Sequence, residues 1–373
     1  MPLLDLNAQY QAIKDDVEKS LQSVIQSQHF ILGPTVENFE KEIASYINVK
    51  YAIGVASGSD AILLSFMALN VKDGDEVVTT PFSFFATAGS IARLGAKPVF
   101  VDIEPDTYNI DPNKIADYLK SNAKKVKAIM PVHLYGQCAE MDSIMDISVK
   151  YNIPVVEDDA QAIGSLYKNK HAGTFGLFGC FSFFPSKNLG AWGDAGLVTT
   201  NDEKSATLIK ALRVHGGLKK YYHQYVGCNS RLDALQASIL SVKLKHLTEW
   251  NKSRDRNAQR YKSLIEKYKL NDVITTPITK PERNHTYHQF TVHVEEKRDE
   301  LVKFLKDAGI GTEVYYPLPL HLQECFRELG YKRGDLPVAE RCAQTCISLP
   351  IYPELTEEMQ EYVVSKIAGF YLK

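Results

Sequence analysis

Three short segments of the chain carry residues that could do chemistry. In the first, Val155–Gln161, an apolar strand runs directly into the acids Glu157, Asp158 and Asp159. Ligands of open α/β sheets bind at the carboxyl ends of the strands, so an acid at this place is a candidate binding or catalytic group. An isolated run of acids after a strand is more often a solvated turn, and the other two segments decide between these interpretations.

The second segment is Cys180–Gly190, in which Lys187 follows an aromatic strand and precedes a glycine-rich turn. A lysine at such a place is either a surface charge with its stem along apolar residues or an amine held partly out of water. The third segment, Ala56–Ala61, is a turn of small residues between a strand and a helix. The free N–H groups at the start of that helix could bind an anion, although Ser and Asp there could equally be an ordinary N-cap.

Taken together, the three segments supply the groups that hold pyridoxal 5'-phosphate (PLP). Asp158 would keep the pyridine nitrogen protonated, so that the ring can accept electrons. Lys187 would form the Schiff base and, once displaced, carry the proton. The turn at Ala56–Ala61 would bind the phosphate through neutral donors, because neither it nor Phe181–Ser186 contains Lys or Arg.

An alternation of short apolar strands and amphipathic helices from about residue 51 to 200 must position these groups. Strands are predicted at Tyr51–Ala56, Glu76–Thr80, Lys97–Asp102, Ala128–Pro131, Pro154–Glu157, Cys180–Phe184 and Gly196–Thr200. Helices between them are predicted at Asp60–Leu69, Ala86–Leu94 and Asp142–Tyr151. This order is typical of a mostly parallel α/β sheet covered on both faces. No glycine-rich dinucleotide or nucleoside-triphosphate loop accompanies it.

The pattern changes after residue 201. The sequence predicts a helix at Lys204–Val214 and a single long helix from near Arg231 to Lys267. An α+β layer follows, with strands at Tyr287–Val294 and Gly311–Tyr316 and helices at Lys297–Ala308, Val338–Cys346 and Glu357–Phe370. A chain of 373 residues favours two domains. We expect a large α/β domain over residues 1–245 and a smaller C-terminal α+β domain over residues 246–373.

The composition excludes several classes of protein. With 43 Lys and Arg against 45 Asp and Glu, the formal charge is −2, so the chain has no basic surface for nucleic acid or an anionic membrane. Its apolar runs are too short to span a bilayer, and its first residues do not resemble a secretory signal. We therefore expect a cytoplasmic protein with six reduced cysteines. No metal site is predicted, because Cys342 and Cys346 have no second ligand pair nearby.

The sequence resembles the DegT/DnrJ/EryC1/StrS family of PLP-dependent nucleotide-sugar aminotransferases, within the type I fold of aspartate aminotransferase. The resemblance extends from Leu4–Leu6 and Ile31–Pro34 to Ser348–Pro353, essentially the whole chain. It implies that Lys187 is the Schiff-base lysine and that Asp158 is the partner of the pyridine nitrogen. Asp159 departs from the family, which usually carries alanine there, and it adds a negative charge beside Asp158.

The resemblance also implies roles for the remaining cofactor residues. Gln161 would lie against the ring hydroxyl, and Phe84 would pack on the pyridine face. The phosphate would be bound by Ser182 and by the backbone of Gly58 and Ser59. Asn229 would reach the phosphate of the neighbouring subunit, which implies a homodimer with shared active sites.

Each of three assignments has a simpler alternative. Phe84 could be a core aromatic, Gln161 could satisfy the backbone at a helix start, and Asn229 could cap the helix beginning near Arg231. Tyr316 and His321 are substrate-site candidates, since in the family the segment Tyr316–Gln323 meets the sugar nucleotide, and Arg231 is a third candidate.

The resemblance implies an aminotransferase that moves an amino group from L-glutamate to a nucleotide-linked keto-deoxyhexose, for amino sugars of surface polysaccharide or glycoconjugate. The segments Pro131–Gln137 and Tyr316–Gln323 are more similar to the branch that aminates 3-keto sugars on dTDP or UDP, with a 4-keto sugar as the alternative. A sugar dehydratase is disfavoured because known dehydratases of this group carry histidine where Lys187 stands. A non-catalytic regulator is disfavoured because Asp158, Gln161, Ser182 and Lys187 are all present.

Overall fold

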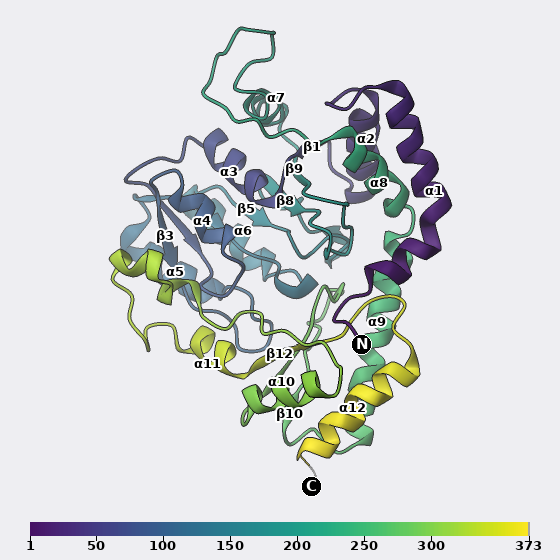
Figure 1. The fold of residues 1–373 in the computed structure, drawn as a ribbon. Helices are drawn as coiled ribbons and strands as arrows, with labels where there is room; N and C mark the ends of the chain where they lie inside the picture. The colour runs from purple at the N-terminus through teal and green to yellow at the C-terminus, as the bar shows by residue number, and fades with distance from the viewer. Residues whose placement is uncertain (372–373) are drawn as a thin grey trace.

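A mixed sheet lies at the centre of the computed structural model, which describes residues 1–371 (Figure 1). Two groups of hydrogen-bonded strands join through parallel bridges between Ile129 and Val155 and between Val132 and Asp158. The resulting strand order is β1 (Tyr51–Val55), β9 (Gly196–Thr200), β8 (Phe178–Ser182), β5 (Val156–Asp158), β4 (Val126–Met130), β2 (Glu76–Thr79) and β3 (Lys97–Phe100). Of these strands, β9 alone runs against its neighbours. The predicted α/β class is confirmed.

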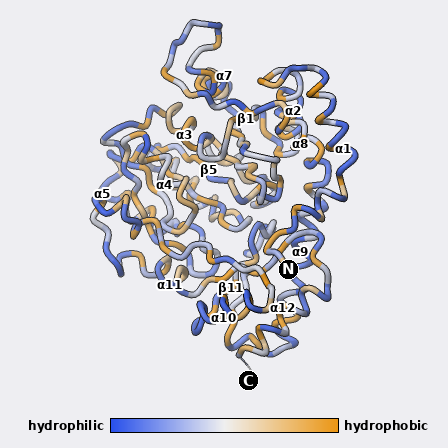
Figure 2. Tube along the Cα trace, viewed as in Figure 1, coloured by the Kyte–Doolittle hydropathy of each residue, from blue (hydrophilic) through white to orange (hydrophobic). Residues whose placement is uncertain are grey.

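Helices cover both faces of the sheet because successive side chains of a strand point to opposite faces. Val77 packs with α3 (Gly58–Ala68), α4 (Ala86–Ala92) and α7 (Glu203–Leu212), whereas Val78 packs with α5 (Pro112–Asn122) and α6 (Met141–Tyr151). The apolar residues of the sheet are buried, while helix α1 (Leu6–Ser27) is mostly hydrophilic (Figure 2). No helix within residues 1–371 is long and apolar enough to cross a membrane.

The predicted single helix from Arg231 to Lys267 is wrong. The structure has two helices, α8 (Ala234–Leu244) and α9 (Leu247–Lys267). The break falls where the chain passes between two cores. Helix α8 packs with α1 and α2 (Pro34–Ile47) at one edge of the sheet, and α9 packs with α12 (Glu357–Tyr371) in the C-terminal layer.

The C-terminal layer is a small antiparallel sheet of β10 (Ile274–Thr275), β11 (Phe290–Val294) and β12 (Cys346–Leu349). Helices α9, α10 (Arg298–Asp307) and α12 pack on it, and α11 (Pro337–Thr345) leads into β12. The predicted strand at Gly311–Tyr316 is wrong, because this segment makes only an isolated bridge between Glu313 and Ser348. Short elements complete the chain: the hairpin β6 (Leu166–Tyr167) and β7 (Lys170–His171), and 3-10 turns at Leu134–Gly136, Leu320–Leu322 and Glu324–Leu329.

The start of the chain returns to this layer. Met1 and Leu4 pack against the C-terminal core, and the Met1 amino group donates to the carbonyl of Gly309 at 2.5 Å. The domain boundary between residues 245 and 246 stays a prediction.

Candidate active site

A cavity of about 430 Å³ lies at the carboxyl ends of β5 and β8, beside the amino-terminal end of α3. The three segments that carry candidate catalytic and binding residues all reach it, although Ala56–Ala61 lies far from the other two in the sequence. Its lining includes Ser57, Gly58, Ser59, Phe84, Thr87, Asp158, Gln161, Ser182, Lys187, His288 and Tyr316.

Asp158 ends β5 and is almost completely buried. One carboxylate oxygen accepts a hydrogen bond from the Thr87 hydroxyl at 2.8 Å, and the other accepts the N–H of Ala160 at 3.2 Å. Burial raises the pKa of Asp158. The hydrogen bonds from Thr87 and Ala160, and then the charge of Lys187, offset only part of this increase. Two donors therefore fix the carboxyl group in one orientation at the cavity.

Lys187 lies in the turn after β8, and its backbone N–H donates to the carbonyl of Phe184 at 2.8 Å. The residue is only partly exposed, and its Nζ lies 3.5 Å from Nε2 of His288. Burial of the amine lowers the pKa of Lys187 to about 8, against the opposing effect of the Asp158 charge. About a tenth of the amine would then be uncharged at pH 7, as a nucleophilic lysine requires.

The amino-terminal end of α3 forms a cradle of neutral donors with Ser182. Ser57 caps the helix by accepting the N–H of Asp60 at 3.1 Å, and the next N–H groups, of Gly58 and Ser59, have no partner within the helix. A Cβ added to Gly58 would lie 2.6 Å from Cβ of Ser182, so glycine is needed for this approach. This cradle fits a phosphate group at a helix start.

Gln161 and Phe84 both belong to the cavity. The side-chain oxygen of Gln161 accepts the N–H of Tyr135 at 2.7 Å, and its amide nitrogen donates to the Tyr316 hydroxyl at 3.0 Å. Phe84 is 59% exposed and its ring centre lies 6.5 Å from that of Tyr316, so it is not a core aromatic. The buried carboxylate, the amine, the cradle and this exposed ring together fit PLP.

Three predicted residues lie outside the cavity lining. Asn229 is exposed and pairs through its backbone with Val214, and it does not cap α8, whose N-cap is Asp233. Arg231 is only partly exposed and does not line the cavity either. His321 is buried, with Nε2 3.2 Å from a carboxylate oxygen of Glu340.

Sequence reasoning missed Thr87 and His288. Thr87 lies three residues after Phe84, but nothing in the sequence there indicates its hydrogen bond to Asp158. His288 comes from the C-terminal layer, 101 residues after Lys187, and only the tertiary fold brings the two together.

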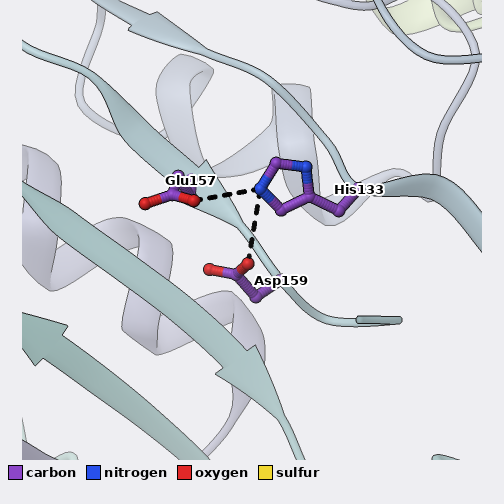
Figure 3. A group of neighbouring side chains, drawn as sticks. All are labelled: His133, Glu157 and Asp159. Carbon is purple, nitrogen blue, oxygen red and sulfur yellow. Dashed lines mark hydrogen bonds and ion pairs between the residues drawn. The ribbon is translucent and has the colours of Figure 1, made fainter. Parts of the chain in front are cut away.

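His133, Glu157 and Asp159 form a second buried group (Figure 3). It lies next to the cavity, because the chain neighbours Val132, Asp158 and Ala160 line that cavity. Nδ1 of His133 accepts the N–H of Ala139 at 3.0 Å, so the neutral ring carries its proton on Nε2 and donates it to Glu157 at 3.0 Å. Metal-ligand atoms of the three residues lie within 4.8 Å of one another, but a protonated Nε2 offers no lone pair to a metal.

Asp159 is the unsatisfied member of this group. Neither of its carboxyl oxygens has a hydrogen-bond partner in residues 1–371, and the nearer one lies 3.5 Å from Nε2 of His133. Burial, and then the charges of Glu157 and Asp158, raise the pKa of Asp159 well above its usual value. Folding therefore favours the protonated form of this carboxyl group.

Comparison with known proteins identifies the family. The model of the DegT/DnrJ/EryC1/StrS aminotransferase family matches residues 11–368. The chain is 51% identical to a pleiotropic regulatory protein of Geobacillus stearothermophilus, over 100% of this chain and 98% of that protein. It is 41% identical to the UDP-2-acetamido-2-deoxy-3-oxo-D-glucuronate aminotransferase of Pseudomonas aeruginosa, over 94% of this chain and 95% of that one.

The crystal structure of S. venezuelae DesV in complex with a ketimine intermediate superposes with a TM-score of 0.94 at 36% identity, covering 99% of this chain and 98% of that one. A match over nearly the whole sequence, together with this likeness in structure, confirms the predicted type I fold. The chain therefore belongs to the DegT/DnrJ/EryC1/StrS aminotransferase family and is a PLP-dependent aminotransferase.

Proposed function

We propose that this protein transfers an amino group from L-glutamate to a nucleotide-linked 3-keto-deoxyhexose, carried on dTDP or UDP, in the cytoplasm. The product would be an amino sugar for surface polysaccharide or glycoconjugate. One observation carries the proposal: the amine of Lys187 and the carboxyl group of Asp158 line one cavity with the donor cradle of α3.

Different residues of the cavity would hold different parts of the cofactor. When bound, PLP supplies an electron sink for a substrate carbanion. Asp158 would keep the pyridine nitrogen protonated, and Lys187 would bind the cofactor covalently and move the proton. Ser182 with the N–H groups of Gly58 and Ser59 would hold the phosphate. Phe84 would pack on the ring, Gln161 would face its hydroxyl, and Tyr316, which contacts Gln161, would lie toward the sugar.

Two considerations favour C3 as the position of amination. The segments Pro131–Gln137 and Tyr316–Gln323 are similar to the 3-keto branch, and the P. aeruginosa relative is named for a UDP-linked 3-oxo sugar. The test uses the enzyme with its cofactor in the amine form, pyridoxamine 5'-phosphate. Matched pairs of 3-keto and 4-keto sugars on dTDP and on UDP are then added. We expect a 3-keto sugar to restore the absorbance spectrum of the aldehyde form of the cofactor. Faster recovery with the 4-keto partner would establish the alternative.

A shared active site requires a homodimer, which we also propose. The loop between α7 and α8 extends away from the body of the molecule at the top of Figure 1. Large apolar side chains on it are exposed in the single chain: Leu218, Tyr221, Tyr222, Tyr225 and Val226. Such a surface is typical of an interface, and a two-fold dimer would bring Asn229 of each chain toward the partner's phosphate cradle.

A regulatory function is the second candidate, because the G. stearothermophilus relative carries a regulatory name. Lys187→Ala tests it against catalysis, with the exposed Lys252→Ala as a matched control. We expect Lys187→Ala to lower turnover about a thousandfold or more while cofactor still binds non-covalently, and Lys252→Ala to behave as wild type. A wild-type protein without turnover on any sugar of the panel would favour the regulatory function.

A further inference from the structure

His288 belongs to the C-terminal layer and contacts the amine of Lys187. It is 5% exposed and lines the cavity just before β11. Its Nε2 lies 3.5 Å from Nζ of Lys187, and Nζ has no other hydrogen-bond partner in the described part of the chain. The chemistry of this contact depends on which ring nitrogen of His288 carries the proton.

A chain of two asparagines, anchored on backbone carbonyls, settles that question. The amide nitrogen of Asn251 donates to the carbonyl of Ile163 at 3.1 Å, so its oxygen is free to accept from Asn188 at 2.8 Å. The amide nitrogen of Asn188 also donates to the carbonyl of Thr286 at 2.9 Å. With both donors of Asn188 directed at carbonyl-type oxygens, its own oxygen must face His288.

The orientation of Asn188 fixes the tautomer of the imidazole. Nδ1 of His288 lies 3.3 Å from the side-chain oxygen of Asn188, which can only accept, so Nδ1 carries the proton. The lone pair of Nε2 then faces Lys187. Burial, followed by the charges of Lys187 and Arg254, lowers the pKa of His288 well below its usual value, so the ring stays neutral.

We propose that His288 is a positioning residue that holds the Lys187 amine by accepting its hydrogen bond, with its acceptor face fixed by Asn188 and Asn251. The proposal rests on the proposed role of Lys187 as the lysine that binds the cofactor. In that role the amine must leave and return to one place in each half of the reaction. A fixed neutral acceptor keeps Nζ at the cavity while the amine is free, and it favours the charged amine without adding a second charge.

The first test measures the titration of Lys187 in the full chain freed of cofactor. Trace labelling with acetic anhydride over a pH series, followed by peptide mass spectrometry, gives the titration midpoint of this one amine, the pH at which half of it is protonated. We expect His288→Leu to lower the midpoint by about one pH unit, a tenfold change in proton affinity, because the acceptor is lost and burial remains.

His288→Gln is the matched control. Its amide nitrogen can donate to Asn188 while its oxygen accepts from Lys187, so we expect the wild-type midpoint to be retained. A midpoint that is unchanged in His288→Leu, or that falls equally in both variants, would overturn the proposal. A purely structural role would leave the midpoint in place in every variant that folds.

A second measurement needs no variant, in case His288→Leu does not fold. Nitrogen-15 NMR of histidine-labelled wild-type protein reports which ring nitrogen carries the proton. We expect the Nδ1–H form of His288 across neutral pH, and the Nε2–H form or a charged ring would contradict the proposal. Borohydride reduction of the cofactor-loaded protein, with peptide mapping, tests the proposed function separately. Cofactor fixed to a residue other than Lys187 would refute that function. The titration midpoint of the Lys187 amine is measured without cofactor and does not depend on that result.

Discussion

Two neighbouring acids at the end of β5 have opposite surroundings, and the alternation of a strand explains the difference. Side chains two residues apart share a face, so Asp159 lies with Glu157 and His133, while Asp158 points to the cavity. The carboxylate of Asp158 receives two hydrogen bonds, and the carboxyl group of Asp159 receives none from residues 1–371. The same residue type at adjacent positions is thus an oriented acceptor in one case and, in the other, a buried acid without a hydrogen-bond partner in the described part of the chain.

Asp159→Asn tests the protonation of the second acid. A carboxyl group whose pKa is raised by folding binds its proton in the folded state while the unfolded chain has released it, so stability falls as pH rises above the unfolded value near 4. Asparagine removes this penalty. We expect the variant to be more stable than wild type at pH 7 by about 1–3 kcal/mol, with the difference vanishing near pH 3.

Urea unfolding at several pH values measures this difference. Asp142→Asn, an exposed acid, is the control for a general effect of removing charge. A stability difference that stays constant from pH 3 to 8 would show that Asp159 is ionised in the native protein.

Asp158→Asn tests the assignment of the electrostatic partner. An amide cannot keep a pyridine nitrogen protonated, so we expect turnover to fall by a hundredfold or more, about 3 kcal/mol in the barrier. The fold and phosphate binding should remain, as circular dichroism and cofactor retention would report. Turnover within tenfold of wild type would exclude Asp158 as the partner of the nitrogen, and Asp159 would not replace it, because it does not line the cavity.

At the scale of elements, the sequence predicted most reliably what local pattern determines. β9 agrees with its prediction at both ends, because Gly196–Thr200 is a fully buried run bounded by a turn. β12 was missed because Cys346 continues the helical spacing of Cys342, and the strand exists only through its pairing with β11. The break before Leu247 is likewise set by the two cores that α8 and α9 join, which no local pattern records.

One buried ion pair ties three elements together. Arg213, just after α7, donates to Glu40 of α2 at 2.5 Å and to the carbonyl of Gly54 in β1 at 2.7 Å, and Glu40 accepts the N–H of Gly54 at 2.8 Å. Arg213→Met would leave the buried Glu40 without its partner. We expect a loss of about 3–5 kcal/mol in the free energy of unfolding.

The double variant Arg213→Met, Glu40→Leu separates the ion pair from the packing. Because it leaves no unpaired charge, it should lose less stability than the sum of the two single variants in a urea-unfolding cycle. Strictly additive losses would mean that the pair is not coupled in the native protein.

At the scale of the whole molecule, the cavity is lined by two parts of the chain, the central sheet and the C-terminal layer. Asp158, Ser182 and Lys187 come from the sheet, and His288 and Tyr316 come from the C-terminal layer. The sheet residues could be predicted because strand ends and helix starts have recognisable sequences. His288 could not, because its contact with Lys187 depends on how the layer packs on the sheet. Asn229 remains a prediction for a related reason, since its proposed partner belongs to another copy of the chain.

Mixed dimers test whether Asn229 acts across the interface. No basic residue lies in the phosphate cradle, so a dianion there would need a further donor, and Asn229 is exposed on the extended loop without a capping role. Lys187→Ala and Asn229→Leu should each be inactive alone. If Asn229 serves the partner's site, a heterodimer has one site with both defects and one with none. Random mixing of equal amounts should then restore about a quarter of the sites.

Mixing Lys187→Ala with Asp158→Asn is the matched control. Both residues line the cavity of a single chain, so every site of that heterodimer keeps one defect and no activity should return. If Asn229→Leu behaved like this control, Asn229 would act within its own subunit, and an active Asn229→Leu protein would remove it from the site altogether. Activity that returns when Lys187→Ala is mixed with Asn229→Leu, and not when it is mixed with Asp158→Asn, would have one meaning. The folded chain of Figure 1 would carry an incomplete site, completed by the loop of its partner.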